Sequence, residues 1–460
     1  MGVLKTLPVR LQSRSVGLGS SLAGVSVIAA GVLGILYFRL PLTLLPLGLG
    51  ALVLALITIR WPNIGLAFVI AAQYAPLQMA GVTMLHLIGA FVGVLCIVWM
   101  AVNRRSVVFP GIIFPIIVMI LLALYSLTFT KDPAVTQVMT RRLVTNVVFC
   151  LLLVNVVDEY RGLRWPLWVL MAMGVVNSAA GVLQFAAQSD AEFRAKGLMG
   201  NETGLGGVAA MGCIISFYHF LYEKERWKRA GYLGLCALLA AGIVTSVSRG
   251  ATFAFVVCIL YILVREVRHR KQVLILVALI LAGLPLAPEN FWRRFEGFGK
   301  QIKGTVFFGE RSALASRGYY NKAGIKIWKA HPILGVGLGS YGYYFIQPEF
   351  NPGKKGSHRL PPHNMYIQAL AETGLVGFLV LCWWILQAAY NYWVASRKTD
   401  DDSQGRFLLG ACETMTLYTM VFYFSSGNLA HTPLAMVIAL SAVCRRCAER
   451  EVREKAAPAA

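Results

Sequence analysis

The sequence predicts an all-α polytopic membrane protein with about 12–14 transmembrane helices. Of its 460 residues, 57% are hydrophobic and only 14% are charged, whereas a soluble fold of this size needs much more polar surface. Apolar runs of about 20 residues, long enough for a helix to cross a bilayer, recur along the chain. Basic clusters alternate with these runs as the positive-inside rule requires. We therefore expect a single integral membrane domain over residues 1–460.

The apolar runs define the expected helices in order. The first group covers residues 17–38, 40–59, 64–80, 82–102, 107–129, 143–157 and 165–187, followed by a run that ends near residue 221. Three more runs cover residues 231–247, 251–264 and 273–287, and a hydrophilic segment of residues 289–362 follows. The last runs cover residues 374–394 and 406–424, with one more before the basic C-terminal segment.

Charge assigns the two sides of the membrane. The N-terminus is basic and no cleavable signal peptide is apparent, so the chain is expected to start in the cytoplasm. The basic clusters at residues 104–105, 161–164, 224–229, 265–271, 397–398 and 445–454 then fall on the same side. The TKDPAVTQVMTRR segment, the loop around Arg194, Ser248-Arg249-Gly250 and residues 289–362 fall outside. Both termini are therefore expected in the cytoplasm.

The segment of residues 289–362 is a large outer loop between two predicted transmembrane helices. It contains twelve lysine and arginine residues against four acidic ones. Long loops escape the positive-inside rule, but this excess of charge still indicates an anionic partner on the outer side. The net charge of +22 does not indicate nucleic-acid binding, because no basic–aromatic motif accompanies it.

The outer loop contains a predicted helix, a glycine-rich turn and a histidine. Residues 312–329 lack proline, and Lys322, Lys326 and Lys329 form a stripe at helical spacing with Ile325 and Trp328 near another face. This pattern is typical of an amphipathic helix on the membrane surface, although a solvated loop helix remains the alternative. Glycines in residues 335–342 then allow a tight backbone path or close approach to a ligand.

Pro361 and Pro362 are expected to begin a helix with His363 in its first turn. A helix N-terminus favours the neutral imidazole that a general base needs, and its free N–H groups bind anions. His363 is therefore a candidate catalytic base. The alternative is a histidine that is merely solvated at the membrane interface.

Arginines collect on the outer side from several separate segments. Arg249 lies between two apolar runs without an acidic neighbour in sequence, Arg194 lies in an earlier outer loop, and Arg142 lies at another outer helix start. Arginine binds phosphate oxygens through a planar pair of donors, so a diphosphate ligand is the natural hypothesis. Snorkelling of Arg249 to the membrane surface remains the alternative. No cluster with metal-ligand spacing accompanies these residues, so neither a metal nor another cofactor is expected.

These segments together resemble the O-antigen ligase/polymerase superfamily. The resemblance rests on Ser248-Arg249-Gly250-Ala251, on Arg317 followed by Trp328 and by His331-Pro-Ile-Leu-Gly-Val-Gly, and on His363-Asn364, nine residues, then Gly374 and Gly377. Residues 194–201 resemble the preceding outer loop of that family. The Thr-His pair that follows in some ligases is replaced by Phe378-Leu379.

The resemblance implies a glycosyltransferase with a GT-C-like fold in the bacterial inner membrane and an active site that faces the periplasm. Its substrates would be an O-antigen glycan linked to undecaprenyl diphosphate and the lipid A–core oligosaccharide, both presented by the lipid bilayer. The implied reaction inverts the anomeric carbon without a metal. His363 would deprotonate the acceptor hydroxyl, while Arg249, Arg317, Arg194 and Arg142 would hold the diphosphate.

Two rival functions remain open. An O-antigen polymerase, or a ligase for another lipid-linked glycan, would differ in the acceptor. A transporter of an anionic lipid or sugar would instead place its key charges at mid-membrane depth.

Overall fold

The computed structural model is helical over almost all the residues it describes, which confirms the all-α class. These are residues 45–75, 78–79, 82–188, 193–283, 285, 287, 289, 291–292, 313–350, 362–400, 404–426 and 429–456. A short antiparallel pair, β1 (Gln78–Met79) and β2 (Val82–Thr83), is the one sheet within them. The expected run of residues 17–38 and most of the segment before residue 313 lie outside the described residues.

The helices follow the apolar runs closely. In the first half of the chain they are α2 (Leu45–Arg60), α3 (Pro62–Gln73), α4 (Met84–Val102), α5 (Ile113–Ser126), α6 (Pro133–Val156), α7 (Tyr160–Ala186) and α8 (Glu202–Tyr222). The second half adds α9 (Arg226–Thr245), α10 (Arg249–Arg265), α11 (Arg270–Gly283), α13 (Ala313–Ala330), α14 (Tyr341–Phe345), α15 (Met365–Lys398), α16 (Gln404–Phe422) and α17 (Thr432–Ala456). Short 3-10 turns, η3 (Gly197–Met199) and η4 (Val267–His269), precede α8 and α11.

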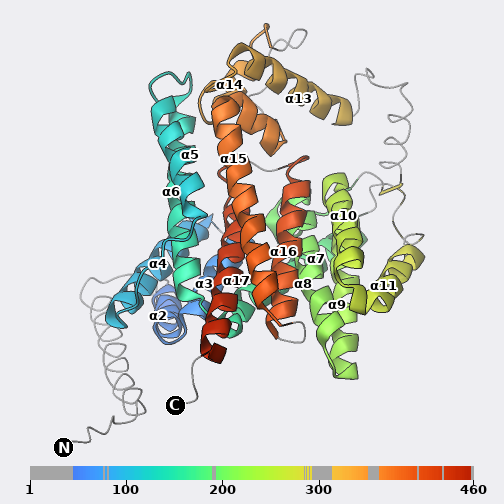
Figure 1. Cartoon of the computed structure of the whole chain (residues 1–460). Coiled ribbons are helices and arrows are strands. Elements are labelled where there is room, and N and C mark those ends of the chain that lie inside the picture. Colours follow the sequence, from blue (N-terminus) through green and yellow to red (C-terminus); the bar gives the residue numbers. More distant parts are fainter. Residues whose placement is uncertain are drawn as a thin grey trace, which may run out of the picture.

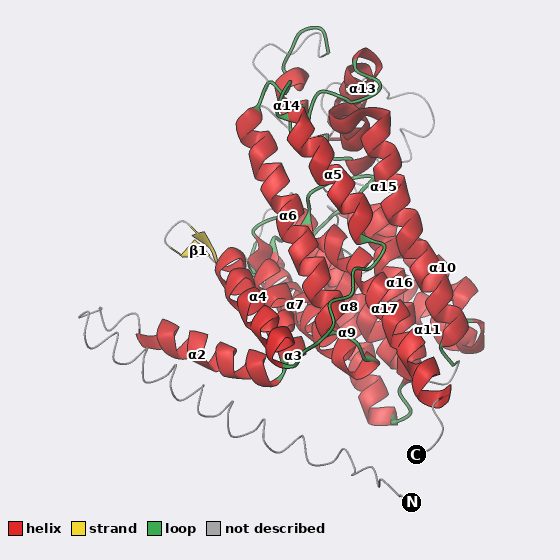
Figure 2. Cartoon of the chain, turned by 60° about the vertical axis from the view of Figure 1, so that its left-hand side comes forward, coloured by secondary structure: helices red, strands yellow, loops and turns green. Residues whose placement is uncertain are grey.

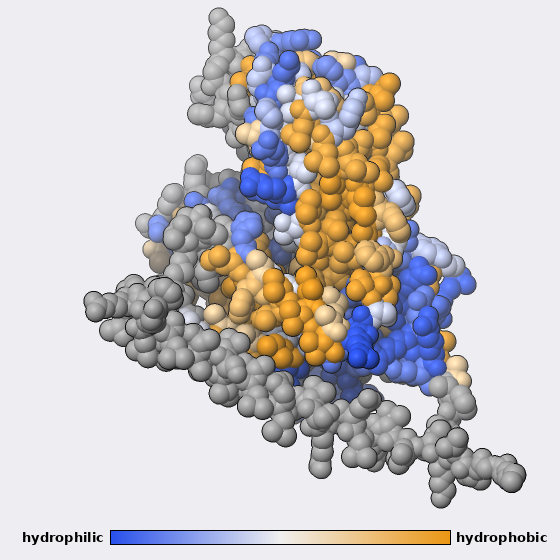
Figure 3. All heavy atoms as spheres, turned by 90° about the vertical axis from the view of Figure 1, so that its left-hand side faces the viewer, coloured by the Kyte–Doolittle hydropathy of each residue, from blue (hydrophilic) through white to orange (hydrophobic). Residues whose placement is uncertain are grey.

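The helices make a multi-pass membrane protein. Six of the described helices are long and apolar enough to cross a bilayer, or seven if the bent pair α10–α11 counts as one span. One face of the molecule shows a broad hydrophobic surface with hydrophilic side chains at both ends (Figure 3), as lipid contact requires. The total of about 12–14 spans stays a prediction, because the chain before residue 45 is not described.

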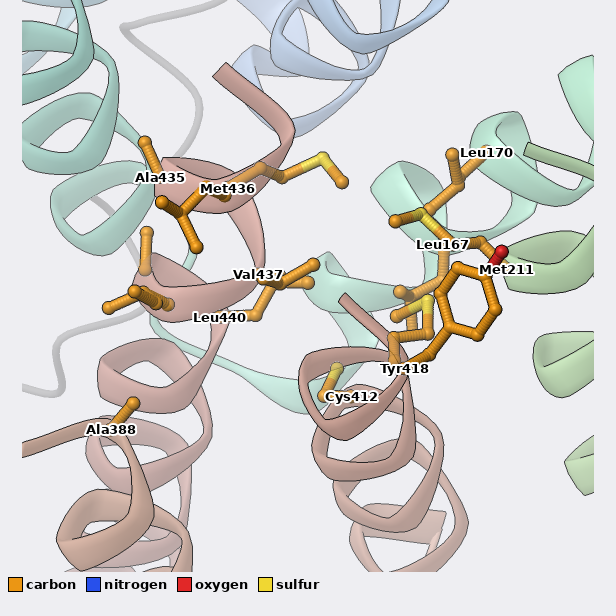
Figure 4. Close-up of a cluster of buried hydrophobic side chains, with 14 of the residues drawn as sticks. Leu167, Leu170, Met211, Ala388, Cys412, Tyr418, Ala435, Met436, Val437 and Leu440 are labelled. Atoms are coloured by element: carbon orange, nitrogen blue, oxygen red, sulfur yellow. The ribbon is translucent and has the colours of Figure 1, made fainter. Parts of the chain in front are cut away.

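The core lies where α7, α8, α15, α16 and α17 meet. Tyr418 of α16 is fully buried beside Leu167 and Met211, and Val437 and Leu440 of α17 face the same interior (Figure 4). Hydrophobic side chains cover α8 and the first part of α17 on almost every side. These two helices are therefore enclosed by protein, which is why no narrow apolar stripe marks them in the sequence.

The apolar runs do not predict the start of α6 or the angle between α10 and α11. α6 begins at Pro133, ten residues before the expected run, because Asp132 caps it by accepting from Val135 N at 3.4 Å and proline fits the first turn. Arg142 consequently lies inside α6 and not at its start. The α10 and α11 axes bend by 99° at their junction, whereas two antiparallel spans would fold back on each other.

The two ends of the bundle gather different segments. At the lower end in Figure 1, Arg450 of α17 pairs with Asp158 and Glu159 at 2.8 Å each, and Arg105 pairs with Asp158 at 2.8 Å. These residues come from the clusters and turns expected at the cytoplasmic side. The α5–α6 turn, the start of α10 and the start of α15 lie at the opposite, upper end (Figures 1 and 2). Which end faces the periplasm stays a prediction.

α15 is broken at Gly374, and the glycine-rich turn fills the break. Gly374 has φ 64° and ψ −163°, which divides α15 into a first arm of residues 365–373 and a long helix of residues 375–398. The freed backbone groups pair with the turn: Gly337 N donates to Glu372 O at 2.8 Å, and Leu375 N donates to Pro332 O at 2.8 Å. The predicted tight backbone path is confirmed, and it serves helix packing.

The turn is also held from the α5–α6 side. Thr136 donates to Leu338 O at 2.7 Å, and the hydroxyls of Thr130 and Ser340 are 2.5 Å apart. Glu372 is buried and accepts from Tyr341 N at 3.3 Å. The outer-loop segment of residues 332–341 is therefore fixed between two helices of the bundle.

α13 lies across the upper end and packs against the first arm of α15 (Figure 1). Its buried face carries Ala323 and Ile327, and a side chain at Gly324 would collide with Ile367. Ile325 is 38% exposed, so the expected apolar face is not the face that packs. The reason is that small residues let α13 approach α15 closely, which a count of large apolar residues does not detect. Lys322, Lys326 and Lys329 are exposed, as predicted.

The Gly374→Ala substitution is expected to destabilise the protein by about 3 kcal/mol or more, because the backbone strain at residue 374 and the steric overlap of the new Cβ both disfavour the folded state. The added Cβ would collide with the carbonyl of Ile333, and φ of 64° with ψ of −163° is open essentially to glycine alone. Thermal unfolding of the detergent-solubilised protein measures the loss. Gly231→Ala is the matched control, because no atom lies within 4 Å of its added Cβ. Equal unfolding temperatures for both variants would contradict this account of the break.

Candidate functional site

The turn after α16, residues 423–425, joins the segments that carry the candidate residues. Met365 N, at the start of α15, donates to Tyr423 O at 3.0 Å. Tyr366 stacks on Phe424 with ring centroids 4.2 Å apart. On the other side, a Cβ at Gly250 of α10 would overlap Ser425 Oγ. The starts of α10 and α15, far apart in sequence, are therefore neighbours through this turn.

His363 lies immediately before the N-cap of α15, and not in its first turn. Asn364 is the N-cap residue, and its side chain accepts from Tyr366 N at 3.0 Å and Ile367 N at 3.1 Å. The expected helix start at the prolines is wrong because asparagine satisfies these N–H groups better than any residue before it. Those two groups are consequently not free to bind an anion.

The backbone of His363 is in the left-handed region, with φ 54°. A non-glycine residue there costs about 1–2 kcal/mol and persists only when its surroundings hold it. Its neighbours Pro362 and Asn364 are buried, while the histidine itself is half-buried. The strain therefore keeps the imidazole at the surface beside the start of α15, a feature typical of functional residues.

α13 covers His363 from above. The Tyr320 ring lies 5.9 Å from the His363 ring, and Tyr341 donates from its hydroxyl to Tyr320 O at 2.7 Å. Arg317 lies three residues before Tyr320 on α13. The structure thus brings the backbone of Arg317 to the neighbourhood of His363; its side chain is outside the described atoms.

Arg249 is the first residue of α10, directly after a strained turn. Val247 has φ 49°, and Ser248 N donates to Ser246 Oγ at 3.3 Å, which ends α9 and turns the chain. The Arg249 side chain is half-buried. Arg249 therefore begins a helix whose next residue, Gly250, packs against Ser425 in the turn of residues 423–425. Its position on the outer side of the membrane stays a prediction.

Arg194 reaches the same region through an ordered loop. Ala195 N donates to Thr245 O at 3.1 Å, next to the α9–α10 turn, and Gln184 of α7 accepts from Gly197 N at 2.9 Å. Arg194 Nη1 lies 3.4 Å from Glu202 Oε1. Its charge is consequently shared with a carboxylate at the start of α8, which the sequence interpretation did not include.

Arg142 lies on α6 one turn before a contact with the segment of His431, a residue that sequence reasoning missed. Asn146, one turn after Arg142 on α6, donates from Nδ2 to Ala430 O at 3.2 Å, which brings this face of α6 beside His431. The Tyr423 hydroxyl hydrogen-bonds His431 Nδ1 at 2.5 Å. The surrounding protein and then the charge of Arg142 lower the pKa of His431 to about 4. The only sequence signal for His431 is a histidine before Thr432-Pro433, a common helix start.

The arrangement combines one strained histidine with three arginines and a second, neutral histidine. Arg249 and Arg194 come from α10 and from the loop before α8, whereas Arg142 and His431 come from α6 and from the start of α17. Within the described residues, no three His, Cys, Asp or Glu side chains are close enough to hold a metal ion. Chemically, the site offers a candidate base between groups that bind anions.

Comparisons with known proteins find similarity over the segment that contains three of the candidate residues. A family model described as O-antigen ligase matches residues 234–382, which include Arg249, Arg317 and His363. The exopolysaccharide production protein ExoQ of Rhizobium meliloti (strain 1021) is 25% identical over 296 residues. That alignment covers 56% of this chain and 66% of ExoQ, so the chain spans just under two thirds of its relative. Arg142, Arg194 and His431 lie outside the residues that the family model matches.

Proposed function

Because the chain belongs to the O-antigen ligase superfamily, whose members join lipid-linked glycans, we propose that it is an O-antigen ligase. It transfers a glycan from undecaprenyl diphosphate to a sugar hydroxyl of the lipid A–core oligosaccharide. The protein lies in the bacterial inner membrane with both termini in the cytoplasm, and its upper end faces the periplasm, where both substrates are presented.

One observation supports the proposal: the start of α10, which carries Arg249, and the start of α15, which follows His363, both contact the turn of residues 423–425. Met365 N pairs with Tyr423 O at 3.0 Å, and Gly250 packs against Ser425. A base and a phosphate-binding arginine are the two groups that glycosyl transfer from a lipid diphosphate needs. Their convergence from helices far apart in sequence supports this chemistry over a role for either residue alone.

His363 is the general base of the reaction. It takes the proton of the acceptor hydroxyl while that oxygen forms a bond to the anomeric carbon. The bond from the anomeric carbon to the diphosphate oxygen breaks, and undecaprenyl diphosphate leaves with the electron pair. Attack opposite the leaving group inverts the anomeric carbon.

Arginines stabilise the charge that develops on the leaving diphosphate. Arg249 is the principal ligand, because it starts α10 beside the turn of residues 423–425. Arg317 is a further ligand in this proposal, because it lies on α13 three residues before Tyr320, whose ring is 5.9 Å from that of His363. Arg194 contributes less because Glu202 already lies 3.4 Å from its guanidinium. Arg142, which the sequence groups with these arginines, lies on α6 beside His431, and its role is considered below.

The identity of the molecule that receives the glycan tests the proposal. The purified protein is incubated with undecaprenyl-diphosphate-linked O-antigen and lipid A–core, and the products are separated by mass. Glycan attached to lipid A–core is the expected product. If the assay yields only longer glycans on undecaprenyl diphosphate, the protein is a polymerase and the ligase assignment fails.

Two observations support the polymerase alternative. ExoQ is named for exopolysaccharide production, and this chain lacks the Thr-His pair found after the second glycine in some ligases, with Phe378-Leu379 in its place. A polymerase would use the same base and the same diphosphate site, with a second lipid-linked glycan as the acceptor.

Transfer is expected to continue when a divalent chelator is added. Arginine guanidinium groups, which need no metal, stabilise the leaving diphosphate in this proposal. The measurement is the initial transfer rate with and without EDTA after dialysis against metal-free buffer. Loss of activity on chelation and its recovery with magnesium would contradict the metal-free mechanism.

A further inference from the structure

His431 is an exposed histidine whose ring orientation is fixed by a buried partner. It ends the loop after α16, and its carbonyl accepts from Leu434 N at 3.1 Å at the start of α17. The Tyr423 hydroxyl holds Nδ1 at 2.5 Å, and Tyr423 itself is buried. The imidazole is therefore accessible and also has a fixed orientation, whereas the ring of an ordinary solvated histidine rotates freely.

The hydrogen bond to Tyr423 assigns the tautomer of His431. Among the residues that the structure describes, His431 is the one hydrogen-bonding partner of the Tyr423 hydroxyl. A buried hydroxyl needs an acceptor for its proton, so Tyr423 donates to Nδ1. The proton of the neutral ring then lies on Nε2, where the described residues provide no acceptor. His431 thus presents an N–H donor to a ligand.

Arg142 supplies a second donor group beside this ring. It is exposed on α6, on the same face as Asn146, whose side chain donates to Ala430 O at 3.2 Å. Its charge is close enough to act on the imidazole of His431. A guanidinium one turn from Asn146 and an imidazole N–H next to Ala430 both match the oxygens of a phosphate or a carboxylate.

Arg142 and His431 lie on the other side of the turn of residues 423–425 from Arg249. Figures 1 and 2 both show α6 and α10 on opposite sides of α15 and α16. The start of α15, with His363 before it, touches the turn between them through Met365 N. A base that serves two substrates has to lie near the groups that bind both. Met365, two residues after His363, contacts Tyr423, whose hydroxyl holds His431.

We propose that Arg142 and His431 bind an anionic group, a phosphate or a carboxylate, on the acceptor glycan. This inference rests on the proposed function, and it divides the site in two. Arg249 and Arg194 bind the diphosphate of the lipid-linked glycan, and Arg142 and His431 orient the acceptor toward His363. Tyr423 is a positioning residue, because it acts only through His431.

Steady-state kinetics separate the two substrates. Arg142→Gln and His431→Ala are each expected to raise the KM for lipid A–core by about tenfold or more, the loss of one charge-assisted or fixed hydrogen bond. The KM for the lipid-linked glycan is expected to stay within twofold of wild type, about the precision of the comparison. His431→Gln, which can place an amide N–H near the Nε2 position, should recover part of the loss. Arg141→Gln, an exposed neighbour on α6, is the matched control.

Phosphatase treatment of lipid A–core distinguishes the two chemical sources. If the bound group is a phosphate, treatment removes the KM difference between wild type and Arg142→Gln. If the difference persists, the group is a carboxylate. An equal rise in the KM for the lipid-linked glycan, with no change for lipid A–core, would overturn the proposal and return Arg142 to the diphosphate site.

Binding without turnover separates failure of this inference from failure of the proposed function. Native mass spectrometry of the full-length protein with undecaprenyl diphosphate, and separately with lipid A–core, measures occupancy directly. Arg142→Gln should lose lipid A–core and keep undecaprenyl diphosphate, and Arg249→Gln should do the reverse. If the wild type binds neither lipid, the proposed function fails. If it binds both and Arg142→Gln loses only undecaprenyl diphosphate, this inference alone fails.

Discussion

His363→Asn and His363→Gly are expected to lower kcat for glycan transfer by about 10²- to 10⁴-fold, the usual contribution of a general base. Neither substitution changes a fully buried side chain, because His363 is half-buried and precedes the N-cap of α15, with the Tyr320 ring 5.9 Å from its own. Both replacements also adopt a positive φ more readily than histidine does. The variants should therefore unfold at the same temperature as wild type or above it.

The expected loss of activity without a loss of stability makes the experiment decisive. A fall in activity together with a rise in stability cannot be attributed to misfolding, whereas His363→Ala would keep the backbone strain at φ 54°. His331→Asn is the control, because this exposed histidine also lies at the upper end, with its ring 5.7 Å from that of Tyr344. Near-normal turnover in His363→Asn would eliminate His363 as the base.

The helices of the fold were largely predictable because each is set by a local property. An apolar run of about 20 residues must form a helix in a bilayer whatever its neighbours are. The deviations arise where another local or tertiary interaction decides. Asp132 starts α6 early by capping it, and Gly374 breaks α15 because the segment of residues 332–337 pairs with the freed backbone.

The candidate site was predictable only in part. Arg249 is conspicuous because it is a charge between apolar runs, and His363 is conspicuous because it follows two prolines in a basic loop. The strained backbone of His363 was not predictable, since it depends on the cap that Asn364 provides. His431 was missed because its significance comes from Tyr423 and Arg142, and the contact with a helix far earlier in the chain leaves no trace in local sequence.

Arg249→Lys is expected to lower kcat by about 10- to 100-fold, and Arg249→Gln by about 10²- to 10³-fold. Lysine keeps the positive charge at the start of α10, but it lacks the planar pair of donors that can bind two diphosphate oxygens together. The difference between the two variants therefore separates the contribution of geometry from that of charge. The measurement is single-turnover transfer at saturating lipid A–core.

Inhibition by inorganic pyrophosphate provides a second readout at the same residue. Pyrophosphate should compete with the lipid-linked glycan in wild type, and its inhibition constant should rise in Arg249→Lys and rise further in Arg249→Gln. Arg141→Lys, on exposed α6 surface, should leave it unchanged. Full activity of Arg249→Lys with unchanged pyrophosphate inhibition would refute bidentate binding. The site would then need only a positive charge at position 249. The planar guanidinium that orients the leaving group would have to come from another arginine, and Arg317 on α13 is the next candidate.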